Sequence, residues 1–407
     1  MNNRFGIVIV TFLAMVLFGI IMQSISPLMP VLIDELGLSH TQGGLLVSLF
    51  ALPGIFFSIP GGFWADIHGP KKVGILSFLL MLVGNIIIAT GSSFAVLAVG
   101  RFIAGIGGTT IVIAAAQALT RAFINNRGLG AAMGIFNAGV PAGTIFAHNV
   151  FSRVVTIWGW QVPILFSALA CLLMLVVFWR CLETESVFAQ RSENNTSATV
   201  PGRIMDSMGY LRDFRVYWGV WLVSFSWMVF VAARIGSISF APVYFLSIGY
   251  EYAYAGFLAS LFTMGSLVIS PLTGYLIDKT GREELYLILG GLILGGLYLL
   301  LFVTTQHLLL SALIGVVGAV GPVSIFALVP KLLPADRLGK GYGILRICEN
   351  AGMLAGPFLV GLSYDLSGSY FYSFLLFTVL LLGSSAFAIL LKVLLIKKGK
   401  ENPQTSS

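Results

Sequence analysis

Long, uninterrupted runs of apolar residues recur along the whole chain, and they constrain its fold more than any other feature. The run "ILSFLLMLVGNIII" at residues 75–88 is one example. A bilayer core about 30 Å thick is crossed by about 20 apolar residues in a helix. Backbone polar groups must pair inside the membrane, which leaves only helices and closed barrels. Barrel strands alternate polar and apolar residues. These runs are continuous, so they predict an all-α membrane protein.

The composition supports a lipid environment. Of the 407 residues, 57% are hydrophobic and only 10% are charged, whereas soluble domains carry about 25% charged residues. The N-terminal apolar stretch is too long for a signal peptide and is interpreted as a retained first span. Reading the apolar runs between polar breaks predicts twelve transmembrane helices, at 5–30, 43–65, 73–91, 95–118, 131–152, 161–180, 217–247, 254–276, 285–304, 307–330, 341–364 and 370–396.

Lysines and arginines are distributed very unevenly between the two sides of these spans. With a cytosolic N-terminus, 19 of the 23 basic residues lie in cytosolic segments, and only Arg153 lies in an opposite loop. This positive-inside pattern predicts that both termini are cytosolic, in a plasma (bacterial inner) membrane. The net charge of +7 therefore reflects topology. Nucleic-acid binding is not expected, because it requires basic and aromatic residues clustered on a soluble face.

One long polar stretch divides the chain into two groups of six spans. It defines an N-terminal bundle at 1–182, a cytosolic linker at 183–215 and a C-terminal bundle at 216–407. The two groups of spans share a repeated sequence pattern. Gly62-x-x-x-Asp66-x-x-Gly69 follows span two, and the same pattern, Gly274-x-x-x-Asp278-x-x-Gly281, follows span eight. Paired six-span halves of this kind are a known transporter architecture, with binding near the midplane between the halves.

The repeated loop resembles the signature motif of the major facilitator superfamily. The copy from Gly274 to Arg282 fits that motif fully, whereas the first copy has Ile67 in place of a basic residue and Pro70 ahead of its lysines. The resemblance implies two pseudo-symmetric six-helix bundles, acting as a monomer by alternating access. "SISPLMPVLIDELGLS" at residues 24–39 is typical of its cyanate and organic-anion branches, without being diagnostic.

The same motif is expected to form a gating latch between the halves. Asp66 lies at the C-terminal end of a helix, where the dipole disfavours a carboxylate, so it needs partners such as Arg127. Gly62 is expected to let helices approach closely, and Gly69 to permit a tight turn. The alternative is a solvated polar turn. The predicted latch comprises Gly62, Asp66, Gly69, Lys71, Arg127, Gly274, Asp278, Gly281 and Arg282.

Four ionisable residues stand out inside the spans: Arg101, Arg234, Arg346 and Glu349. Such residues are costly in a membrane and mark functional sites by default. Their excess positive charge favours an anion, and arginine binds carboxylates with two parallel hydrogen bonds. We therefore expect the three arginines to bind an anionic substrate. The alternative is that they are structural, holding backbone carbonyls or a fixed acid.

Two of these sites are also candidates for proton coupling. Arg101 begins an Arg-x-x-x-Gly-x-Gly sequence that resembles the family's span-four motif, which implies a part in proton coupling. Arg346 and Glu349 share a helix face and form either a permanent ion pair or a switch, in which protonated Glu349 frees Arg346 to bind an anion. Gln23, Asn137 and Gln117 are secondary candidates for the substrate cavity; the alternative is that each bonds to a neighbouring helix. His148 is expected to lie at the surface near the outer end of its span.

These features predict a secondary active transporter and not an enzyme. The sequence contains no HExxH metal site and no phosphate-binding loop. No cofactor or metal is expected; the proton is the expected coupling ion. The favoured function is proton-coupled symport of a small organic anion such as a carboxylate. The alternative is efflux of drugs or metabolites by proton antiport.

Overall fold

The computed structural model describes residues 4–123, 128–182, 214–333 and 337–401, and every regular element in these ranges is a helix. The N-terminal half contains α1 (Arg4–Gln23), α2 (Ile25–Leu36), α3 (His40–Ser48), α4 (Leu52–Thr90), α5 (Phe94–Ala122), α6 (Leu129–Phe146), the π-helix η1 (Ala147–Phe151), α7 (Ser152–Trp158) and α8 (Gln161–Cys181). The C-terminal half contains α11 (Phe214–Ser247), α12 (Tyr252–Thr280), α13 (Glu283–Val303), α14 (His307–Gly318), α15 (Val320–Leu332), α16 (Leu338–Ser367) and α17 (Tyr370–Glu401).

The predicted all-α fold is confirmed. Eleven segments within the described ranges are long and apolar enough to cross a membrane. The twelfth predicted span is α16, which runs beside them for 30 residues but is less apolar because it carries Arg346, Glu349 and Asn350. The predicted linker, 183–215, lies almost entirely outside the described residues, so its boundaries stay a prediction.

The turn predicted between spans two and three is a sharp kink within α4. Gly69 has φ 78° and ψ 157°, which interrupts the helix in a region that a residue with a Cβ atom avoids. The helix continues to this kink and resumes at Pro70, so the break is narrower than the predicted gap from 65 to 73. A proline suits the start of the second segment because its missing N–H group is not needed there.

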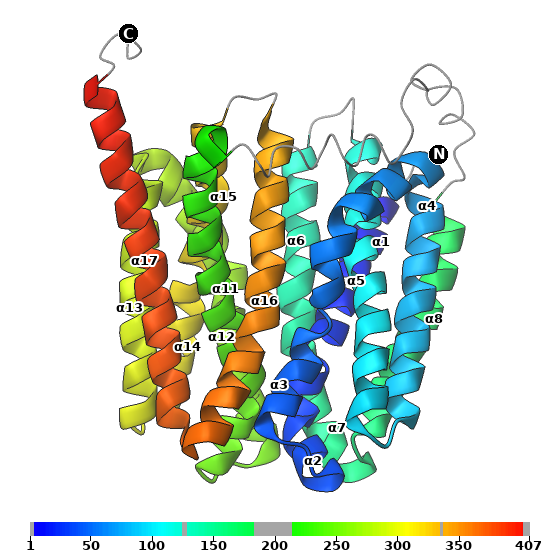
Figure 1. Cartoon of the computed structure of the whole chain (residues 1–407). Coiled ribbons are helices and arrows are strands. Elements are labelled where there is room, and N and C mark those ends of the chain that lie inside the picture. Colours follow the sequence, from blue (N-terminus) through cyan, green and yellow to red (C-terminus); the bar gives the residue numbers. More distant parts are fainter. Residues whose placement is uncertain (1–3, 124–127, 183–213, 334–336, 402–407) are drawn as a thin grey trace.

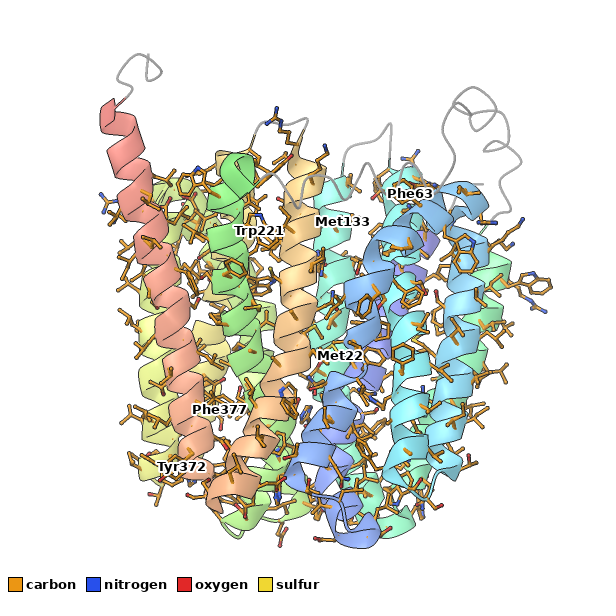
Figure 2. All side chains as sticks on the ribbon, viewed as in Figure 1. Met22, Phe63, Met133, Trp221, Tyr372 and Phe377 are labelled. Atoms are coloured by element: carbon orange, nitrogen blue, oxygen red, sulfur yellow. The ribbon has the colours of Figure 1, made fainter. Side chains whose placement is uncertain are left out.

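Both chain ends lie at the same end of the helical bundle (Figure 1). We call this end the terminal face, and the opposite end, where α2 and α7 lie, the distal face. Apolar side chains project from the outer surface between the two faces (Figure 2). On α8, for example, Leu165, Leu169, Leu172 and Val176 are exposed at helical spacing, as expected for a lipid-facing surface.

Glycines let the two halves meet closely along the seam between them. A Cβ atom at Gly44 on α3 would collide with the carbonyl of Pro357 on α16, and one at Gly361 would collide with the carbonyl of His40. On the other side of the seam, Gly256 of α12 packs equally closely on the carbonyl of His148. These backbone-to-backbone contacts join the halves toward the distal face.

A carboxylate from one half caps a helix of the other at the distal face. Asp365 near the end of α16 accepts hydrogen bonds from His40 N (3.1 Å), Thr41 N (2.8 Å) and Thr41 Oγ1 (2.6 Å) at the start of α3. The next amide, Gln42 N, bonds to Ser39 Oγ within the same helix. The first amides of a helix lack internal partners. Here α16 supplies the partners for two of them.

Candidate functional site

A polar face of α16 lies where the halves meet. Arg346 Nη1 donates to Glu349 Oε2 at 2.9 Å, and Asn350 Nδ2 donates to the carbonyl of Arg346 at 2.9 Å. The Arg346 side chain is 51% exposed and that of Glu349 is 18% exposed. Asn350 packs directly on Gly54 of α4, in the other half. The predicted pair is therefore formed, and the arginine retains an open side.

Aromatic rings from three helices of the C-terminal half form a wall beside Arg346. Its guanidinium lies 5.9 Å from the ring centre of Phe326 on α15. Phe326 stacks on Tyr342 at 6.1 Å and meets Trp227 of α11 edge-on at 6.0 Å. The Trp227 Nε1 donor is buried without a hydrogen-bond partner among the described residues. The wall therefore combines apolar surface, a cation and a free donor.

Pro330 explains the hydrogen bond between Tyr342 and Phe326 within this aromatic wall. Pro330 lies four residues after Phe326 and has no N–H group, so it leaves the Phe326 carbonyl without its usual helical partner. Tyr342 Oη donates to this carbonyl at 3.3 Å. That bond fixes the Tyr342 ring against Phe326, next to Arg346.

The contacts that join the halves lie between this site and the distal face. Asn350 is twelve residues into α16, about 18 Å from its first residue at a rise of 1.5 Å per residue. Its contact with Gly54, and those of Pro357, Gly361 and Asp365 further along α16, all involve the other half. On α6, Asn137 is exposed toward the terminal side of the seam contact at His148. The two halves are therefore in contact between this site and the distal face.

Arg101 is fully buried and directs its donors at backbone carbonyls. Nη1 and Nη2 bond to Ile21 O (2.7 Å) and Met22 O (3.0 Å), next to the break between α1 and α2, and Nε bonds to Leu46 O of α3 (2.8 Å). The guanidinium also lies 4.7 Å from the ring centre of Phe50. The Ile21 carbonyl also accepts from Ser24 N at 3.3 Å and from Ser24 Oγ at 2.9 Å, so Arg101 adds a further donor beside the helix break. This geometry is that of the structural alternative, and a substrate or proton-coupling role for Arg101 stays a prediction.

Arg234 lies inside the C-terminal half. Nη2 bonds to the carbonyl of Phe262 at 2.6 Å, and Nη1 lies 3.4 Å from Tyr298 Oη. The guanidinium packs on Gly318, where a Cβ atom would collide with it. No residue named above contacts more than one of the arginines Arg101, Arg234 and Arg346. The structure therefore does not bring the three arginines together in a single site.

The three secondary candidates for the substrate cavity, Gln23, Asn137 and Gln117, lie in different environments. Gln23 is 1% exposed, and neither of its amide atoms has a hydrogen-bond partner among the described residues. Asn137 is exposed on α6. Gln117 instead donates from Nε2 to Asp66 Oδ1 at 2.7 Å, so it contacts the predicted latch and not the arginines.

The predicted latch residues that the structure describes lie at the terminal face, and the bonds of Asp66 and Gly281 stay within their own halves. Asp66 pairs with Gln117 of α5, and Gly281, with φ 63°, ends α12. Lys331 and Glu283 form an ion pair of 2.6 Å that sequence reasoning missed. Lys71 is partly buried, Gly274 has only one neighbour at van der Waals distance, Asp278 and Arg282 are exposed, and Arg127 lies outside the described residues.

The structure corrects two expectations about individual residues. A Cβ atom at Gly62 would have no neighbour within 4 Å, so the predicted close helix approach is absent in this conformation. His148 is not a surface residue but is 0% exposed, because its ring lies in the seam between the halves. The distance of a histidine from the end of an apolar run does not reveal which helix covers it.

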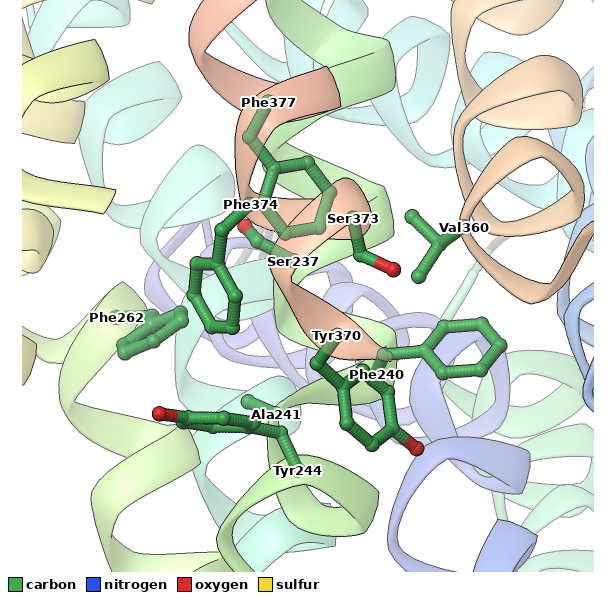
Figure 3. Close-up of a pocket in the computed structure, with 10 residues that line it drawn as sticks. All are labelled: Ser237, Phe240, Ala241, Tyr244, Phe262, Val360, Tyr370, Ser373, Phe374 and Phe377. Carbon is green, nitrogen blue, oxygen red and sulfur yellow. The ribbon is translucent and has the colours of Figure 1, made fainter. Parts of the chain in front are cut away.

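A small cavity lies within the C-terminal half (Figure 3). Ser237, Tyr244 and Phe262 line one part of it, and Tyr370, Ser373 and Phe377 of α17 line another. Its free volume is about 10 Å³, which is about the space of one water molecule. It is too small for an organic substrate.

The membrane-spanning helices, the repeated halves and the polar face at their seam together define a membrane transporter. A family model described as the Major Facilitator Superfamily matches residues 11–308 and 247–407. The chain belongs to this superfamily. Its relatives are transporters, and it is a transporter and not an enzyme.

Three relatives show the range of substrates in proteins similar to this chain. The lysosomal dipeptide transporter MFSD1 of Danio rerio is 24% identical, with 83% of this chain and 76% of the relative covered. The tetracycline resistance protein, class H, of Pasteurella multocida is also 24% identical, with 98% of each chain covered. The probable sulfoacetate transporter SauU of Cupriavidus necator is 27% identical, with 90% of this chain and 88% of the relative covered.

A solved structure shows the same fold. It is a bacterial homologue of the human lysosomal transporter Spinster, in an inward-facing and occupied conformation. The TM-score is 0.79 at 16% sequence identity, and 96% of this chain and 97% of the other chain are covered. The likeness extends over both halves.

Proposed function

We propose that this chain is a proton-coupled symporter that takes up a small organic anion such as a carboxylate. Arg346 binds the anion and Glu349 carries the proton. One observation carries the proposal: the 2.9 Å ion pair between these residues, with half of the Arg346 side chain exposed. An arginine that pairs with an acid on one side and is open on the other can exchange that acid for a substrate carboxylate.

The proposed exchange follows from the two acceptors that compete for one guanidinium. When a Glu349 carboxylate oxygen binds a proton, the Arg346–Glu349 ion pair loses its charge attraction. The guanidinium then accepts the substrate carboxylate in a bidentate geometry. When the substrate leaves, Arg346 again stabilises ionised Glu349, and the proton departs. Phe326 limits the movement of the guanidinium on the closed side.

The remaining expectations belong to the same proposal. The terminal face is cytosolic, as the distribution of lysine and arginine predicts, and the protein acts as a monomer in a plasma membrane. Substrate then enters from the distal face and leaves at the terminal face. Arg101 and Arg234 contribute positive charge to the interior, which favours an anion over a cation. The similarity to a sulfoacetate transporter supports an anionic substrate.

A second candidate function is proton-antiport efflux of drugs or metabolites. The aromatic wall of Trp227, Phe326 and Tyr342 favours it, because large rings supply apolar contact area. The similarity to a tetracycline resistance protein points the same way. Under this alternative Glu349 exchanges its proton for a lipophilic substrate and Arg346 has no part in binding.

Proton flux in proteoliposomes distinguishes the two functions. With a pH-sensitive dye inside, small carboxylates added outside are expected to bring protons in with the wild-type protein. Arg346→Ala and Glu349→Gln are expected to abolish this flux, and Arg153→Ala, which removes an exposed arginine at the distal face, is the matched control. Proton movement opposite to an added lipophilic cation, with no response to carboxylates, would establish antiport instead.

A further inference from the structure

The buried ring of His148 connects the two halves at the distal side of the seam. It belongs to η1, and its Nδ1 atom lies 2.9 Å from the carbonyl of Thr144 in its own half. Its Nε2 atom lies 3.1 Å from Ser26 Oγ of α2 and 3.3 Å from the carbonyl of Ile238 of α11, in the other half. Every polar neighbour of the ring is an oxygen.

The Ile238 carbonyl requires a donor from outside its own helix. Residue 242, four positions further along α11, is a proline, so the N–H group that would normally bond to this carbonyl is missing. Such a carbonyl is costly when left unpaired inside a membrane. Ser26 Oγ lies 2.8 Å from Ser239 O and 3.2 Å from Ile238 O. Its single proton serves only one of them, and Ser239 O is the nearer.

A neutral imidazole cannot satisfy this set of acceptors. If the proton is on Nε2, it pairs with Ile238 O, but the Nδ1 lone pair then faces the Thr144 carbonyl at 2.9 Å. If the proton is on Nδ1, Nε2 offers a lone pair to Ile238 O and needs the Ser26 proton for itself. Only the imidazolium donates to both carbonyls while Ser26 donates to Ser239.

We propose that His148 is a proton-binding site in the seam between the halves, on its distal side. There an imidazolium joins the Thr144 carbonyl of one half to the Ile238 carbonyl of the other. The proton is taken from water while the halves are apart at the distal face, and the closing seam encloses it. The bond formed is the N–H bond on the ring, and no other covalent bond changes. Protonation therefore favours the closed distal face.

No charged side chain contacts the ring among the described residues. The titratable residues on the helices around it bond elsewhere or lie toward the helix ends; Arg234, for example, bonds to Phe262 O. The other such groups on or next to α1, α2, α7, α11 and α12 are Arg4, Asp34, Glu35, Arg153, Arg215, Tyr217, Tyr244, Tyr250, Glu251, Tyr252, Tyr254, Tyr275, Asp278 and Lys279. A buried charge depends on fixed dipoles where no counter-ion is present, and here the carbonyls supply them.

Opening of the distal face is expected to release the proton. Separation of the halves removes Ile238 O and Ser239 O from the ring and its Ser26 neighbour. The donor on Nε2 then loses its partner in the other half, and water has access to the ring. The ring then exchanges its proton with the solution at the distal face. Lower pH at the distal face thus shifts the conformational equilibrium toward closure.

Distance measurements between spin labels test this site directly, in lipid nanodiscs without substrate. Ser92→Cys and Thr305→Cys place labels on exposed distal loops of the two halves, in a Cys181→Ser background that removes the exposed native thiol. The fraction with short label distances is expected to rise between pH 8 and pH 5.5. One linked proton can change the ratio of closed to open molecules by at most about tenfold per pH unit.

His148→Gln is expected to abolish this pH dependence. His307→Gln is the matched control, because His307 bonds to Tyr250 within the C-terminal half, and it should leave the dependence unchanged. His40→Gln tests the other histidine of the seam, which lies 3.3 Å from Asp365. A wild-type protein without pH dependence, or a dependence lost with His40→Gln and kept with His148→Gln, overturns the proposal.

A second variant keeps the histidine and changes its acceptor. Pro242→Ala restores an N–H group for the Ile238 carbonyl, so this variant is expected to weaken the pH dependence although His148 is intact. An unchanged dependence in Pro242→Ala would contradict the role given to this carbonyl. This test uses no substrate and does not involve Arg346 or Glu349. A protein that fails to transport carboxylates can therefore still pass it, and the reverse also holds.

Discussion

Removal of the Asp365 carboxylate should open the distal face, because this group caps α3 only while the halves are in contact. It accepts three hydrogen bonds from His40 and Thr41. Replacement of a capping side chain costs about 0.5–2 kcal/mol, and a negative charge at a helix N-terminus adds about 0.3–1 kcal/mol when exposed. The carboxylate is 26% exposed, so solvent screens part of the charge term.

We therefore expect Asp365→Ala to destabilise the closed distal face by about 2 kcal/mol, which lowers the ratio of closed to open molecules by roughly 30-fold. Asp365→Asn retains an acceptor and loses the charge, so a loss of about 1 kcal/mol, or roughly fivefold, is expected. The Ser92 and Thr305 label pair reports both ratios at fixed pH. Asp34→Asn, at an exposed acid of α2, is the control. An unchanged or larger closed fraction in Asp365→Ala would refute the capping argument.

Three further substitutions probe contacts described above. Arg101→Ala should lower the free energy of unfolding by about 3 kcal/mol or more, since three buried carbonyls lose donors; lost transport with an unchanged melting temperature would indicate a functional role instead. Gly44→Ala places a methyl group against the Pro357 carbonyl and should disfavour distal closure by about 1–3 kcal/mol, measured as label distances. Gly69→Ala, at φ 78°, should cost about 1–2 kcal/mol in thermal unfolding, and an unchanged melting temperature would argue against a strained kink.

Much of this fold could be predicted because lipid imposes a simple rule on the sequence. Helices that face hydrocarbon must be apolar over their full length, so their number and approximate limits are visible as runs. The weakest apolar signal belongs to α16, because this helix turns Arg346, Glu349 and Asn350 toward the seam. The same polar face that makes α16 hard to recognise as a span marks it as part of the candidate site.

The partners of the buried polar groups could not be predicted, because they depend on which carbonyls lose their helical bonds. Arg101 contacts the break between α1 and α2. His148 contacts the Ile238 carbonyl, which lacks a helical partner because of Pro242 and lies 90 residues from His148 in sequence. The spacing of apolar residues carries no information on such pairs. The Arg346–Glu349 pair was predictable because both residues lie on one helix, three positions apart.

The cap that Asp365 provides at the start of α3 also allows opening of the distal face to be measured without spin labels. Each time the distal face opens, the amides of His40 and Thr41 lose their acceptor, while Gln42 keeps the Ser39 hydroxyl. Hydrogen–deuterium exchange at the two leading amides should therefore follow the frequency of opening, and the third amide should serve as an internal reference. The exchange rates of a few backbone amides would then record how often the distal face of the transporter opens.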